Sequence, residues 1–231
     1  TLGNVVHPIE MAEKYSCDAL RYFVLREMVF GSDGDFTEAA MVKRYNADLA
    51  NDFGNLVSRV VAMIQRYLGG RMPEFVRPMP DDRALLAEFD KVRDLLPGHI
   101  ERMRLSDAIE TILQAVRAVN RYLDAQAPWN LHKQQQGERL AAVLAASARA
   151  AAQAAGLLWP AMPAKCDEAL ACFGLDPASL SETDRWNVDA PKPGAAVAES
   201  ASLFPRVDAK TIEKPAGKAS APAAPAKEKS K

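Results

Sequence analysis

Hydrophobic residues in the middle of the chain recur at intervals of three and four positions, which is the spacing of one face of an α-helix. A first series ends at Gly69 and Gly70, which are typical of a helix C-terminus. Its apolar positions are Phe53, Leu56, Val57, Val60, Ile64 and Leu68. A second series predicts a helix that stops at Pro97 and Gly98. Its apolar positions are Leu85, Leu86, Phe89, Val92 and Leu96.

Further helices are expected toward the C-terminus. Ser106 is a good N-cap for a third helix, which has to end before Pro128. Its apolar positions are Ile109, Ile112, Leu113, Val116, Val119 and Leu123. An alanine-rich helix is predicted over residues 138–158, and a shorter one over 164–173. Several amphipathic helices with short connections indicate a mainly α fold, built as an antiparallel bundle.

The N-terminal segment is harder to interpret. Pro8 suits the first turn of a helix, and residues 11–15 can continue it. Residues 19–30 are rich in aromatic and β-branched side chains, so both helix and strand remain open there. After residue 175 the helical periodicity fades.

Charge is nearly balanced, with 29 basic and 30 acidic residues and a formal net charge of −1. Net charge alone therefore gives no sign of a nucleic-acid-binding protein. Residues 209–231 differ, because they hold six Lys and two Glu among Ala and Pro, with no aromatic residue. We expect this tail to be disordered, since it cannot bury enough apolar area to offset its ordering entropy. A solvated linker is the simpler interpretation, and a weak, salt-dependent contact with RNA backbone is the alternative.

The cellular location follows from cysteines and hydropathy. Cys17, Cys166 and Cys172 are odd in number and lack paired spacing, which fits a reducing cytoplasm. No apolar run reaches the roughly 18 residues of a membrane span, and the first ten residues do not resemble a secretory signal. The chain begins at Thr1 rather than Met, so we expect it to continue a longer protein.

Common catalytic motifs are missing from the sequence, including the P-loop, GxSxG and GxGxxG patterns. His7, His99 and His132 are scattered, and we expect each to be structural or simply exposed. Asp33 and Asp35 flank a glycine, but the later ligands of a calcium loop are absent, so we expect a turn. Without a CxxC pair a zinc site is not expected.

Asn51, Asn55 and Arg59 are four positions apart, so on an α-helix they lie within about 80° of one another. The apolar positions of the same helix point to roughly the opposite side. Amides and guanidinium groups can form paired hydrogen bonds with base edges. On the pattern alone, an ordinary solvated helix face is the simpler interpretation.

Trp129 follows Pro128 at the end of a helix, where the chain has to turn. A tryptophan in this position can present a flat face to solvent, and stacking a base on it is worth roughly 1–3 kcal/mol. The alternative, which the pattern alone favours, is that Trp129 closes the end of the bundle. Trp159 and Trp186 are expected to be packing residues.

Several segments resemble class I aminoacyl-tRNA synthetases. Residues 2–8 (LGNVVHP) are similar to the segment after the KMSKS-type loop, and residues 18–23 (DALRYF) resemble the DALRY motif of the stem-contact region. The methionyl-tRNA synthetase family in particular is matched by FGSDGDFTE, RYNADLANDFGNLVSR and APW, at residues 30–38, 44–59 and 127–129. Residues 158–170 and 203–207 resemble its closing helices and the peptide that returns to the catalytic domain.

The resemblance implies four parts. These are a stem-contact segment with Asp18 and Arg21 (residues 1–40), a helical anticodon-binding domain (41–175), a return peptide (176–208) and the tail (209–231). Thr1 corresponds to the last position of the KMSKS-type loop, so the HIGH motif and the loop lysines are absent. We therefore expect no catalytic residue and no metal site in this chain, and no adenylate formation by it alone. Methionine-dependent pyrophosphate exchange by the isolated chain would contradict this expectation.

The resemblance also implies recognition of a CAU anticodon. Asn51, Asn55 and Arg59 would contact base edges, and the wobble cytosine would stack on Trp129 beside Pro128. Which asparagine makes the decisive contact stays open. The parent would be a cytoplasmic methionine–tRNA ligase whose Rossmann-type catalytic domain binds ATP and magnesium, often with zinc, and whose partner is tRNA(Met).

Two alternatives remain at this stage. One is a separately expressed helical RNA-binding module, and the other is a helical scaffold with a basic tail. An upstream reading frame that encodes a HIGH-containing domain would distinguish the ligase from the module. Binding of a CAU stem-loop would eliminate the scaffold.

Overall fold

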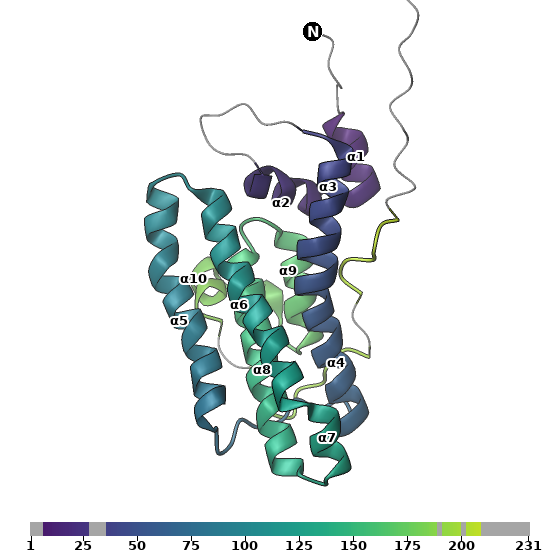
Figure 1. The fold of residues 1–231 in the computed structure, drawn as a ribbon, viewed down its shortest axis with the longest axis vertical. Helices are drawn as coiled ribbons and strands as arrows, with labels where there is room; N and C mark the ends of the chain where they lie inside the picture. The colour runs from purple at the N-terminus through teal and green to yellow at the C-terminus, as the bar shows by residue number, and fades with distance from the viewer. Residues whose placement is uncertain (1–6, 28–35, 189–190, 200–201, 209–231) are drawn as a thin grey trace, which may run out of the picture.

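The computed structural model describes residues 7–27, 36–188, 191–199 and 202–208, and most of these residues are helical (Figure 1). The long helices α4 (Asn55–Leu68), α5 (Pro80–Glu101), α6 (Leu105–Gln126) and α8 (Gly137–Leu158) form a bundle. In Figure 1, α4 and α6 run downward while α5 and α8 run upward. The shorter α9 (Pro163–Cys172) packs beside α8. The mainly α fold class is therefore confirmed.

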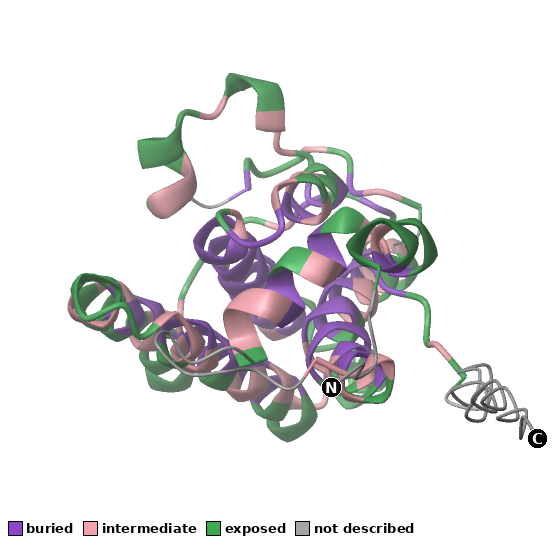
Figure 2. Ribbon diagram, turned by 90° about the horizontal axis from the view of Figure 1, so that it is seen from above, coloured by how far each residue is buried: buried purple, intermediate pink, exposed green. Residues whose placement is uncertain are grey.

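The predicted apolar faces point into this bundle. In α4 and α6 the faces are buried, apart from the partly exposed Leu68. Helix α8 is central and contacts α4, α5, α6 and α9, and its alanines allow close packing on several sides. By length and composition alone α8 could span a membrane, but 89% of its apolar window is buried, as expected of a core helix. The end-on view in Figure 2 shows buried residues on the inner sides of the helices.

At the upper end of the bundle lie α1 (Pro8–Tyr15) and α2 (Cys17–Glu27), so residues 17–27 are helical rather than extended. Next, α3 (Glu38–Arg44) begins at Thr37, whose hydroxyl accepts a hydrogen bond from the Ala40 amide at 3.1 Å. It continues into a π-helical stretch, η1 (Tyr45–Gly54), and then into α4. The three elements form one long helical rod that joins the end with α1 and α2 to the opposite end of the bundle (Figure 1).

Three sequence predictions of local structure are wrong. Pro97 does not end α5, which continues through the proline to Glu101, so the helix tolerates the backbone hydrogen bond that the proline cannot form. Ser106 does not cap α6, because the helix already begins at Leu105. The Ser106 hydroxyl accepts a hydrogen bond from the Arg26 guanidinium instead. Tyr45–Gly54 is π-helical rather than α-helical, so side chains there advance by less than 100° per residue.

Beyond α9, η2 (Pro177–Ser179) and α10 (Glu182–Trp186) precede a peptide that runs back along the bundle. Its backbone pairs with the loop after α4, where the Met72 amide donates to the Ala195 carbonyl at 2.9 Å. Farther on, Phe204 is buried against Tyr45 and Phe53, with ring centroids 5.9 and 6.4 Å away. Gly54 permits this approach, because a Cβ there would lie 3.4 Å from the Phe204 ring and only 2.8 Å from the Leu49 carbonyl.

Candidate nucleic-acid interface

The asparagine and arginine side chains singled out in the sequence lie along η1 and α4. Asn55 and Arg59 share one face of α4, because both belong to its regular α-helical part. Asn55 is exposed, and no hydrogen bond of its side chain to another described residue is found. Asn51 lies in η1, and its Oδ1 accepts a hydrogen bond from the guanidinium of Arg206 in the return peptide. The structure therefore leaves Asn55 available and engages Asn51.

Arg59 reaches across to the last turn of α6. Its Nη2 lies 2.6 Å from Oδ1 of Asp124, a carboxylate that is 63% exposed. An ion pair this exposed contributes little to stability, so an RNA group can replace the carboxylate at low cost. The pair also directs the guanidinium toward the chain segment that leads to Trp129, five residues after Asp124.

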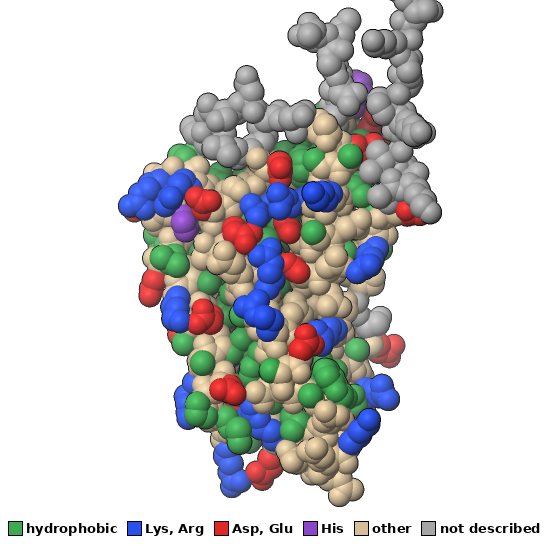
Figure 3. All heavy atoms as spheres, in the orientation of Figure 1, with side chains coloured by type: hydrophobic (Ala, Val, Ile, Leu, Met, Phe, Trp, Pro, Cys, Tyr) green, Lys and Arg blue, Asp and Glu red, His purple; other side chains and the backbone are tan. Residues whose placement is uncertain are grey.

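Trp129 lies in α7 (Pro128–Lys133), a short helix at the lower end of the bundle. Ala127 adopts a left-handed conformation with φ of 44°, which separates α7 from α6, and the buried Pro128 occupies the first helical position. Trp129 is 38% exposed, whereas Trp159 and Trp186 pack against the core as expected. In Figure 3, Lys and Arg side chains run down the middle of this face, and hydrophobic side chains gather below them.

Asp18 and Arg21 fasten α2 to the connection between α8 and α9. Asp18 Oδ2 accepts a hydrogen bond from the Lys165 amide at 2.7 Å, in the first turn of α9. Arg21 donates to the carbonyls of Pro160 and Ala161 at 2.8 and 3.2 Å. In this structure both side chains hold α2 against the neighbouring helices, and their contact with a tRNA stem stays a prediction.

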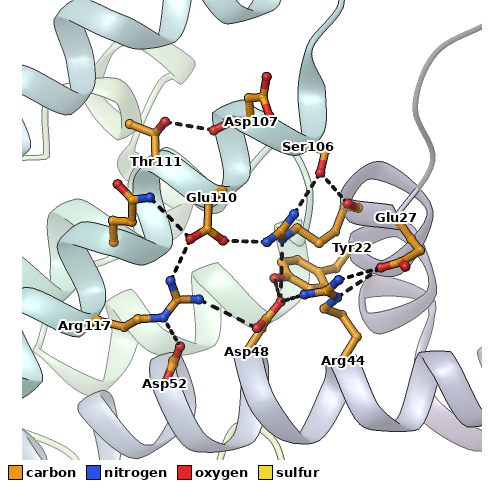
Figure 4. Close-up of polar contacts among 12 residues, drawn as sticks. Tyr22, Glu27, Arg44, Asp48, Asp52, Ser106, Asp107, Glu110, Thr111 and Arg117 are labelled. Carbon is orange, nitrogen blue, oxygen red and sulfur yellow. Dashed lines mark hydrogen bonds and ion pairs between the residues drawn. The ribbon is translucent and has the colours of Figure 1, made fainter.

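A cluster of charged residues, missed in the sequence, connects α2, η1 and α6 (Figure 4). At its centre is Asp48, only 3% exposed, which accepts a hydrogen bond from the Tyr22 hydroxyl at 2.8 Å. Arg26, Arg44 and Arg117 place guanidinium nitrogens 3.7, 3.6 and 3.9 Å from its carboxylate. Burial, together with the Asp48 charge, raises the pKa of Tyr22 above its ordinary value.

Two further carboxylates complete this cluster, which we call the polar joint (Tyr22, Arg26, Arg44, Asp48, Asp52, Glu110 and Arg117). Glu110 bridges Arg26 at 2.5 Å and Arg117 at 2.8 Å, while Asp52 lies 2.7 Å from Arg117. Burial alone would raise the pKa of Glu110, but the hydrogen bond from Arg117 and the charges of Arg117 and Arg26 together outweigh burial and hold that pKa below its usual value. A sequence signal did exist, because Asp48 interrupts the apolar positions around Leu49.

The remaining candidates for chemistry do not form a site. Among the described residues, no group of three or more His, Cys, Asp or Glu side chains could hold a metal ion. Cys166 is buried, which raises the pKa of its thiol and makes it a packing residue. Thr1, Asp33 and Asp35 lie outside the described residues, as does the tail over 209–231.

Comparison with known proteins matches this architecture. Residues 1–61 fit the family model described as tRNA synthetases class I (M), and residues 72–222 fit the one described as the anticodon binding domain of methionyl tRNA ligase. The second match covers well over half of the chain. The chain belongs to the methionyl-tRNA ligase family. The family resemblance found in the sequence is thus confirmed, whereas the predicted part boundaries at residues 40, 175 and 208 stay predictions.

Individual relatives agree with this assignment. The chain is 35% identical to the methionine–tRNA ligase of Thermotoga maritima, over 93% of this chain and 34% of that protein. It is 37% identical to the enzyme of Lactiplantibacillus plantarum, over 89% and 31%. The solved Mycobacterium tuberculosis methionyl-tRNA synthetase with methionyl-adenylate matches with a TM-score of 0.82 and 34% identity, over 89% of this chain and 41% of that one. The chain thus spans about a third of the length of these curated relatives.

Proposed function

We propose that this chain is the part of a cytoplasmic methionine–tRNA ligase that recognises the CAU anticodon of tRNA(Met). The parent enzyme would attach methionine to tRNA through methionyl-adenylate, with ATP, magnesium and often zinc held in its Rossmann-type catalytic domain. The observation that carries the proposal is the exposed ring of Trp129 at one end of an otherwise well-packed bundle. It follows Asp124, the partner of Arg59, by five positions in the sequence.

The contacts suit an unpaired RNA loop better than a duplex. Single-stranded bases are recognised by stacking on an aromatic ring combined with hydrogen bonds to their edges. Trp129 supplies the ring for the wobble cytosine, with Pro128 fixing the start of its helix. Arg59 supplies donors from α4, and the amide of Asn55 supplies both a donor and an acceptor one turn away.

Asn55 is the better candidate for the decisive asparagine contact. Its amide is exposed and free of side-chain partners among the described residues, so binding a base requires no rearrangement. Asn51 would first have to release Arg206, or act together with it as a secondary contact. Under this proposal, Asn55→Ala weakens binding of the anticodon more than Asn51→Ala does.

The test measures binding of this chain to a CAU anticodon stem-loop and to the same RNA with the first anticodon base changed to uracil. Fluorescence anisotropy of labelled RNA gives both dissociation constants. We expect the CAU stem-loop to bind at least tenfold more tightly, because each good base contact is worth roughly 1–3 kcal/mol. Equal affinity for the two RNAs would contradict anticodon recognition. No binding of either would favour a purely structural module.

A further inference from the structure

A second aromatic surface lies at the same end of the molecule as Trp129. The His132 ring stacks on the Tyr67 ring, with centroids 4.6 Å apart and planes inclined by 28°. His132 is exposed and belongs to α7, three positions after Trp129. Tyr67 packs partly against the core from the last turn of α4, eight positions after Arg59.

Helix geometry relates this stack to the proposed anticodon contacts. Three positions on α7 separate His132 from Trp129 by about 4.5 Å along the axis and about 60° around it. Eight positions on α4 place Tyr67 about 12 Å beyond Arg59 along that helix. The same eight positions turn Tyr67 by about 80° around α4 relative to Arg59, so the stack lies close to Trp129 on α7 and beyond Arg59 along α4, on a neighbouring face.

The stack is exposed and has basic neighbours. Tyr67 stacks on the His132 ring, and His132 is nonetheless exposed to solvent. The Arg66 guanidinium lies 5.6 Å from the centre of the Tyr67 ring, and Lys133 is exposed directly after His132. No ion pair of Arg66 or Lys133 with another described residue is found.

We infer that the His132–Tyr67 stack is a second site for an unpaired nucleobase, which holds the loop nucleotide next to the base on Trp129. The inference rests on the proposed function, since it takes the bound loop as its ligand. Arg66 and Lys133 would contact the phosphates of that nucleotide. Aromatic stacking accepts any base, so this site adds affinity without adding anticodon specificity.

A purely structural role makes a different prediction. If His132 only anchored α7 to α4, its truncation would lower the denaturation midpoint of the protein and would affect RNA binding only through misfolding. A stacking site predicts the reverse, with an unchanged midpoint and weaker binding. The two roles are therefore separated by measuring both properties on the same variants.

The test uses the whole chain and the CAU anticodon stem-loop. We expect His132→Ala to raise the dissociation constant about tenfold with an unchanged urea midpoint. His132→Phe keeps a flat ring and should restore most of the affinity. Asn130→Ala, an exposed change in the same short helix, should bind like the wild type.

A set of stem-loops, each with one abasic loop position, locates the nucleotide. At one position next to the wobble base, loss of the base should weaken binding by the wild type, and His132→Ala should cause no further loss. If His132→Ala binds normally while Trp129→Ala does not, the second site is wrong and the proposed function stands. If the wild type binds the CAU stem-loop no more tightly than the RNA with the changed first anticodon base, or if Trp129→Ala does not weaken binding, the proposed function itself is wrong. A lowered midpoint that His132→Phe does not correct would also overturn the second site.

Discussion

The polar joint and the proposed reading surface (Asn55, Arg59, Trp129 and His132), which extends from the start of α4 to α7 at the lower end of the bundle, use polar residues in opposite ways. In the joint, Asp48 and Glu110 each form ion pairs with at least two arginines, so their charges are neutralised within the protein. On the reading surface, Asn55 and the rings of Trp129 and His132 are exposed, and Arg59 holds only an exposed carboxylate. The charges hold the structure together, while neutral and aromatic groups are left available for a ligand.

This contrast explains why the net charge of the chain does not indicate a nucleic-acid-binding protein. In the joint, arginines that would otherwise add positive charge to the surface are paired with acids, as Arg26, Arg44 and Arg117 all are. Reading bases needs edges and rings rather than net positive charge. A chain with a formal net charge of −1 can therefore carry a nucleic-acid interface.

Breaking the joint should have the largest effect. Asp48→Asn keeps the shape of the side chain but leaves Arg26, Arg44 and Arg117 around a neutral group. Removing one partner of a buried ion pair typically costs about 3–5 kcal/mol, and we expect a loss of this size in the free energy of unfolding measured by urea denaturation. Asp52→Asn, on the partly exposed side of the joint, is the matched control and should cost less. A loss below about 1 kcal/mol for Asp48→Asn would show that the joint is not a stabilising element.

The joint should also make stability depend on acid pH. The pKa of Glu110 is held below its usual value in the folded protein, so its stabilising contribution is present above pH 4.5, the unfolded pKa, and disappears as pH falls through the folded pKa. We expect the free energy of unfolding to fall when pH is lowered from about 5 to 3. Glu110→Gln should flatten this dependence in urea titrations at several pH values. An identical slope in the variant would assign the acid sensitivity to other carboxylates.

Changing the reading surface should instead affect binding. Trp129→Ala removes a partly exposed ring, so we expect a loss of roughly 1–3 kcal/mol in binding the CAU stem-loop, with a much smaller change in stability. Trp186→Phe, far along the chain and packed on the core, serves as the control for binding. In the full-length ligase, Trp129→Ala should reduce tRNA charging while methionine activation stays nearly intact. Equal losses in both reactions would contradict the separation of the two functions.

The helices of the bundle were largely predictable, because their apolar faces repeat every three or four residues and all face one core. The features that were not predictable depend on contacts between distant parts of the chain. Asn51 is engaged by Arg206, 155 positions later, and Ser106 bonds to Arg26, 80 positions earlier. In the π-helical stretch, Asp48 and Asp52 both pair with Arg117 of α6, and the absence of a side chain at Gly54 leaves room for Phe204. No local pattern specifies such an arrangement.

The smallest expected effect concerns the one ion pair on the reading surface. Asp124→Asn removes the carboxylate that Arg59 contacts at 2.6 Å, but Asp124 is 63% exposed and water can solvate the freed guanidinium. Surface pairs of this kind contribute about 0–1 kcal/mol, and salt screens them. We expect the free energy of unfolding to change by less than about 1 kcal/mol at low salt and negligibly in 1 M salt. A loss approaching that of Asp48→Asn would mean that the polar joint and the proposed reading surface are held by the same kind of interaction, and the contrast between them would be wrong.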